Sequence, residues 1–157
     1  MIQPFQKKMI ASMPKAENHI HIEGSIPLYL ALELAEKNHV KLPCDTAQGL
    51  RQWIKDTKGT YGLNGFMYCN RKINSVCIHE EDYEAVVMEL AKQAKVQNII
   101  YQELFLDYPL NEERGIPIEV VMDGYITAKK RAIDELGVEL VYIACLLYTS
   151  PSPRDTR

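Results

Sequence analysis

Three short, mostly apolar runs, each next to a longer amphipathic stretch, constrain the fold of this chain most strongly. The runs cover residues 18–22, 98–106 and 138–147. The two clearest amphipathic stretches, 80–97 and 117–136, carry apolar residues at helical spacing. Apolar strands separated by helices pair in parallel and are covered by those helices. The sequence therefore predicts an α/β fold with a parallel sheet.

The segment that connects the first two strands is unusually long, from residue 24 to residue 97. A helix is expected to start at 25–27, because a serine can cap a helix and a proline suits its first turn. A second helix is expected over 46–55, followed by a glycine-rich loop over 58–65. Residues 66–76 are ambiguous and could be helical. Long insertions after a strand often carry function, such as a lid over a site.

Composition and charge exclude several classes of protein. The 157 residues are 46% hydrophobic and 25% charged, which is ordinary for a globular domain. The net charge of −3 provides no basic field for nucleic acid, and no apolar run reaches the roughly 20 residues of a membrane span. Residues 1–8 lack the apolar stretch of a signal peptide, which favours the cytoplasm. The four cysteines form no C-x-x-C pair and are interpreted as reduced thiols, and no specific protein partner is predicted.

The end of the chain differs from the rest in composition. Residues 148–157 have no apolar face and contain two prolines. The run CLLYTSPSPRD resembles the translation of a sequencing adapter. We therefore expect one domain over 1–145 and an artefactual, disordered tail over 146–157. A natural polar tail is the alternative.

Two histidines lie two residues apart in the first predicted strand. Side chains alternate between the faces of a strand, so His19 and His21 should point one way while the neighbouring isoleucines point the other. Two imidazoles on one face are a natural start to a zinc site. H-x-H alone also occurs by chance, but here Glu23 and Gly24 follow at once, at the carboxyl end of a strand, where parallel α/β barrels place their active sites.

The segment MPKAENHIHIEGSIP resembles the opening of the adenosine and adenine deaminases, whose usual form is P-K-x-E-x-H-x-H-L-(D/E)-G-(S/T). The resemblance continues through IIYQELFLDYPLNEERGIPIEVVMDGY and covers roughly residues 13–145. It implies an incomplete TIM (β/α)8 barrel, comprising about the first three strands with their helices. It also implies a Zn2+ ion that activates a water for attack on the purine C6, with release of ammonia.

The resemblance assigns roles to particular residues. His19 and His21 correspond to the first two zinc ligands, and His21, Glu23 and Glu103 to substrate-binding positions. The alternative for Glu23 is an acid that interacts favourably with the following helix. No catalytic residue is expected in this chain, since the family takes its remaining ligands and its catalytic acids from later strands. Asp107 could have a functional role, but an acid in this position is more often a loop residue that ends a strand.

The substrate implied is a small purine nucleoside or base. Adenosine, deaminated to inosine by a full-length parent protein, is the first expectation, and this truncated chain is expected to be inactive. Glu23 and the sequence Glu103-Leu104-Phe105, where the family often has E-x-R, favour the adenine-type branch instead. Adenine or another aminopurine is therefore the alternative, and a small non-catalytic α/β module is the third possibility.

Overall fold

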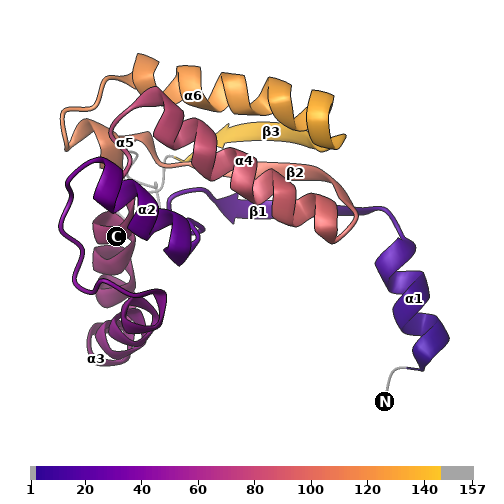
Figure 1. Cartoon of the computed structure of the whole chain (residues 1–157), viewed down its shortest axis with the longest axis horizontal. Coiled ribbons are helices and arrows are strands. Elements are labelled where there is room, and N and C mark those ends of the chain that lie inside the picture. Colours follow the sequence, from indigo (N-terminus) through magenta and orange to yellow (C-terminus); the bar gives the residue numbers. More distant parts are fainter. Residues whose placement is uncertain (1–2, 146–157) are drawn as a thin grey trace, which may run out of the picture.

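The computed structural model describes residues 3–145, which form a three-stranded parallel sheet with helices against one face (Figure 1). The strands are β1 (Lys15–His21), β2 (Ile99–Leu106) and β3 (Glu139–Ala144), in the order β1-β2-β3. The α/β prediction is confirmed. The predicted tail over 146–157 lies outside the described residues and stays a prediction.

Two helices cover the sheet. Helix α4 (Glu80–Val96) and helix α6 (Ile118–Arg131), which continues into the π-helical turn η1 (Ala132–Leu136), bury their apolar faces against β2 and β3. They pack closely, because a Cβ added at Gly124 of α6 would lie 2.4 Å from the carbonyl oxygen of Glu80. The core between sheet and helices includes Val86, Val87, Leu104, Val121, Tyr125 and Leu140.

The long connection after β1 folds as α2 (Leu28–Lys37) and α3 (Ala47–Asn74). The loop predicted for 58–65 is wrong, because α3 runs through it with a kink at Gly62, whose φ is 55° and ψ is −131°. Glycine adopts this conformation at little cost. Gly65 also serves packing, because a Cβ there would lie 2.4 Å from the Thr57 carbonyl oxygen.

Two smaller helices complete the described residues. Helix α1 (Pro4–Ser12) extends away from the rest of the molecule, with none of its residues buried (Figure 1). Helix α5 (Tyr108–Glu112) is a short helix that follows β2. Within 3–145, no helix is both long and apolar enough to cross a membrane.

Strand β1 is less buried than its apolar sequence suggests. Its neighbour Ile22 is buried, and Ile20 packs against the core, but Asn18 and His19 are exposed. The reason is the position of β1 at the edge of the described sheet, where it pairs with β2 alone. The edge of β1 that faces away from β2 therefore stays unpaired among the described residues.

Candidate active site

Strand β1 contains a bulge at the histidines. Glu17 pairs with Gln102, and Ile20 pairs with Leu104. Three steps along β1 therefore match only two steps along β2. His19 lies in this bulge with a φ of 66°, which is left-handed and uncommon for any residue but glycine. Glu17 and Ile20 consequently both lie on the helix side of the sheet, while His19 and His21 lie on the other side.

The two imidazole rings lie together over one aromatic side chain. The ring centroids of His19 and His21 are 5.3 Å apart, and both rings stack on Phe105 of β2, at 4.4 Å and 5.4 Å. Imidazole nitrogens suit zinc, so this pair fits the first two positions of a zinc site. Zinc ligation itself stays a prediction.

The described residues do not by themselves form a complete metal site. Within 3–145 there is no cluster of three or more histidine, cysteine, aspartate or glutamate side chains that could hold a metal ion. Catalytic zinc sites usually take three protein ligands. Further ligands would therefore come from outside the described residues.

Glu23 follows β1 and is buried, with 3% of its surface exposed. Its Oε1 accepts a hydrogen bond from the backbone N–H of Asp107 at 2.9 Å and a longer one from the Tyr125 hydroxyl at 3.5 Å, while its Oε2 has no partner among the described residues. Burial raises the pKa of Glu23 from its usual 4.5 to about 7, and the nearby Asp107 carboxyl adds to the rise. Glu23 therefore titrates near neutral pH.

Asp107, interpreted from the sequence as a loop acid, is part of the same site. It follows β2 directly, only 4% of its surface is exposed, and its Oδ1 has no hydrogen-bond partner in the described part of the chain. Burial raises its pKa, and His21 partly opposes this rise. Its position at the carboxyl end of a parallel strand, beside the carboxyl end of β1, is the signal that could have found it.

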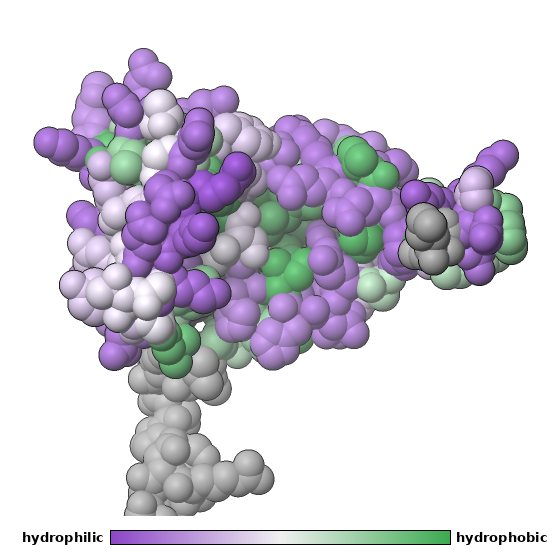
Figure 2. Space-filling model, turned by 90° about the horizontal axis from the view of Figure 1, so that it is seen from below, coloured by the Kyte–Doolittle hydropathy of each residue, from purple (hydrophilic) through white to green (hydrophobic). Residues whose placement is uncertain are grey.

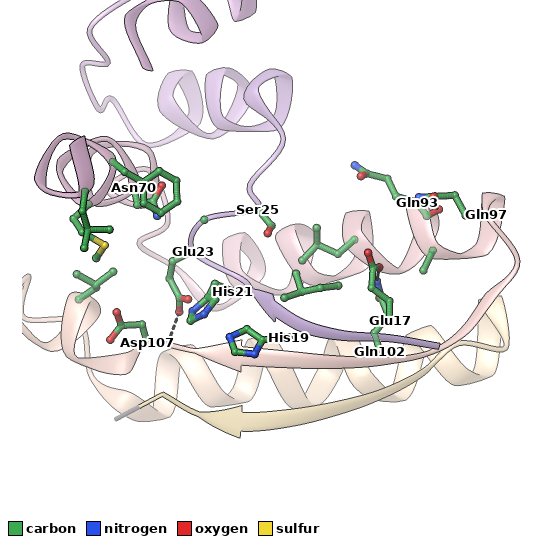
Figure 3. A pocket seen from close by; sticks show the side chains of 18 residues that line it. Glu17, His19, His21, Glu23, Ser25, Asn70, Gln93, Gln97, Gln102 and Asp107 are labelled. Carbon is green, nitrogen blue, oxygen red and sulfur yellow. Dashed lines mark hydrogen bonds between the residues drawn. The ribbon is translucent and has the colours of Figure 1, made fainter. Parts of the chain in front are cut away.

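These groups open into one cavity of about 590 Å³ along the free edge of β1 (Figure 3). Figure 2 looks onto this face of the molecule and shows apolar residues in a hollow that hydrophilic residues surround. His19, His21, Glu23 and Asp107 lie toward one end of the cavity. The second half of α3 covers that end with Leu63, Phe66, Met67 and Asn70. The connection after β1 thus contributes a wall of the cavity.

Other residues singled out from the sequence lie elsewhere. Glu103 is half-buried, accepts a hydrogen bond from the Tyr101 hydroxyl at 3.2 Å, and does not line this cavity. Its predicted contact with substrate stays a prediction. The other two histidines of the chain, His39 and His79, are exposed near helix ends.

A family model described as adenosine deaminase matches residues 14–156. The chain therefore belongs to the adenosine deaminase family, as the resemblance in the sequence predicts. It is 32% identical over 147 residues to an adenine deaminase from Gibberella zeae, and 36% identical over 143 residues to one from Zymomonas mobilis. These matches cover 93% and 89% of this chain but 42% and 40% of the two relatives. The chain thus spans about two fifths of their length.

Several solved structures have a fold similar to that of this chain. The fold is similar to that of an adenine deaminase from Arthrobacter aurescens, with a TM-score of 0.76 and 27% identity, over 83% of this chain and 39% of that one. An amidohydrolase from Burkholderia ambifaria with bound Zn gives a TM-score of 0.74 at 17% identity, over 92% and 38% of the two chains. Arabidopsis ADAL complexed with GMP gives 0.63 at 17% identity, over 87% and 41%. The predicted section of a (β/α)8 barrel is confirmed.

Proposed function

We propose that the full-length protein to which this chain belongs is a zinc-dependent aminopurine deaminase whose preferred substrate is adenine. The reaction replaces the C6 amino group by oxygen from water and releases ammonia. His19 and His21 would supply two of the zinc ligands. When bound, zinc provides a Lewis acid that activates water near neutral pH.

The observation that carries the proposal of a purine site is the pair of buried acids beside the histidines. Glu23 Oε2 and Asp107 Oδ1 are buried, line the cavity and have no partner among the described residues. A free purine base has an N–H group on its five-membered ring that can donate a hydrogen bond to a carboxyl oxygen. A nucleoside carries its sugar at that nitrogen instead. The names of the two curated relatives favour adenine over adenosine.

The same acids supply the argument for adenosine as the second candidate. Sugar hydroxyl groups are donors too, and carboxyl oxygens accept from them equally well. Because the pKa of Glu23 is about 7, this side chain is half protonated near neutral pH and can then donate as well as accept. Asp107 is the second acceptor in either case. The apolar side chains Leu63, Phe66 and Met67 of α3 would keep water away from the bound purine.

The test uses the full-length protein with zinc, supplied separately with adenine and with adenosine, while ammonia release is measured. We expect faster turnover of adenine, a rise in KM for adenine in Asp107→Asn, and loss of turnover in His19→Ala and His21→Ala. Tyr29→Phe, on the exposed surface of α2, is the control and should retain activity. Faster turnover of adenosine would overturn the choice of base, and full activity of His21→Ala would overturn the zinc assignment.

A further inference from the structure

On the helix side of the sheet, directly before the histidine bulge, a side-chain hydrogen bond joins β1 to β2. The Nε2 of Gln102 donates to the Oε2 of Glu17 at 2.9 Å. Gln102 is only 2% exposed, and Glu17 is half-buried. Figure 3 shows the two side chains together, at the opposite end of the cavity from Glu23 and Asp107. This pair therefore lies apart from the residues proposed to contact substrate.

We propose that Glu17 and Gln102 are positioning residues that hold the bulge of β1 and thereby set the position of the His19 ring over Phe105, an inference that rests on the proposed zinc-binding role of the histidines. The bulge requires that the backbone be fixed on both sides of the extra residue. After the bulge, Ile20 is held by packing against the core. Before it, the hydrogen bond from Gln102 holds Glu17 on the helix side.

Without this bond, a regular strand becomes the competing arrangement. A shift of the first part of β1 by one residue would place Asn18 opposite Gln102 and turn Glu17 to the other face, since side chains alternate along a strand. That shift removes the bulge. It also lets His19 leave its left-handed φ of 66°, a conformation that costs free energy in any residue with a Cβ. His19 would stay on the same face of the sheet as His21 but would lie opposite Glu103, one position short of Phe105, and its ring would lose its stacking contact with Phe105.

The first test needs no metal and uses nuclear Overhauser cross-peaks of the 157-residue chain. The ring centroids of His19 and Phe105 are 4.4 Å apart, so their ring protons give a cross-peak. We expect the cross-peak in the wild type and in Glu17→Gln, whose amide oxygen still accepts from Gln102. It should be lost in Glu17→Ala and in Gln102→Ala. Gln93→Ala, another amide that lines the cavity, is the matched control and should retain it.

Two variants remove the bond from opposite strands, so failure of one to fold leaves the other as the test. Circular dichroism identifies a variant that has lost its helices. Persistence of the His19–Phe105 cross-peak in a folded Glu17→Ala or Gln102→Ala chain would overturn the inference. Its loss in Gln93→Ala would overturn it as well, because the effect would then not belong to the bond between Glu17 and Gln102.

The second test is a titration of the same chains with Zn2+ alone. Residues that orient a metal ligand typically change metal affinity by about 10-fold or more. We expect Glu17→Ala to weaken zinc binding by about 10-fold, while Glu17→Gln matches the wild type. His21→Ala should remove specific binding. Equal zinc affinity of the wild type and His21→Ala would refute the zinc site itself. Equal affinity of the wild type and Glu17→Ala, with His21→Ala impaired, would refute the positioning role.

Discussion

Replacing Glu23 by glutamine should change how the stability of the metal-free chain depends on pH. The carboxyl of Glu23 is buried, and its pKa in the folded chain is about 7, against 4.5 for an ordinary glutamate. An acid whose pKa is raised by folding favours the folded state while it is protonated. The wild type therefore has its full stability below about pH 4.5 and loses it as the pH rises from 4.5 through 7.

The size of the effect follows from the two pKa values. They differ by about 2.5, and each pKa unit corresponds to about 1.4 kcal/mol, so the free energy of unfolding falls by about 3 kcal/mol between these limits. Glutamine keeps the oxygen that accepts from the backbone N–H of Asp107 but has no charge to bury. Glu23→Gln should match the wild type near pH 4.5 and be more stable by up to about 3 kcal/mol at pH 8.

The assay is urea unfolding of both chains at a series of pH values with a chelator present, followed by the fluorescence of Trp53, the single tryptophan. Subtracting the free energies of unfolding of the two chains at each pH cancels the contributions of the titrating groups that the substitution does not affect. Glu33→Gln, the same chemical change on the exposed surface of α2, is the control and should show no such difference. Parallel curves for Glu23→Gln and the wild type from pH 4.5 to 8 would refute the argument.

Three further substitutions test the packing that carries the site. Gly124→Ala should destabilise the chain by about 2 kcal/mol or more, because its Cβ would lie 2.4 Å from the Glu80 carbonyl oxygen. Gly59→Ala, where the added Cβ meets open space, is the control and should not destabilise the chain when the midpoints of urea unfolding are compared. Asp82→Ala should cost about 2 kcal/mol in thermal unfolding, because it leaves two backbone N–H groups before α4 unpaired. Gly62→Ala should cost about 1 kcal/mol or more in urea unfolding, because its φ is 55°; an unchanged midpoint would contradict this.

The parts of the fold that the sequence predicted well depend on local patterns. Helices α4 and α6 appear where apolar residues recur at helical spacing, and strands β2 and β3 appear at two of the short, mostly apolar runs. The continuation of α3 was not predictable from such patterns. Gly62 and Gly65 resemble loop residues in sequence, and the need for Gly65 arises only where the chain packs against Thr57.

In the site, too, the features that depend on local patterns were predictable, and those that depend on contacts between distant residues were not. Strand alternation predicts that His19 and His21 face the same way, and in the structure both rings stack on Phe105. The bulge at His19 was not predictable, because it appears only when β1 is matched against β2, more than 80 residues later. The association of Asp107 with Glu23 was not predictable for a similar reason, since it joins residues that are 84 positions apart.

The wall that α3 contributes to the cavity has a consequence for how this protein can diverge. Leu63, Phe66 and Met67 belong to the long connection after β1, outside the strand–helix units that build the sheet. Met67 and Phe66 are half-buried and Leu63 is exposed, so substitutions there disturb few core contacts. Changes in α3 can therefore alter the shape offered to a ligand while the histidines and the sheet beneath them stay as they are. Selection for a new substrate and selection for a stable fold would act on different stretches of the same gene.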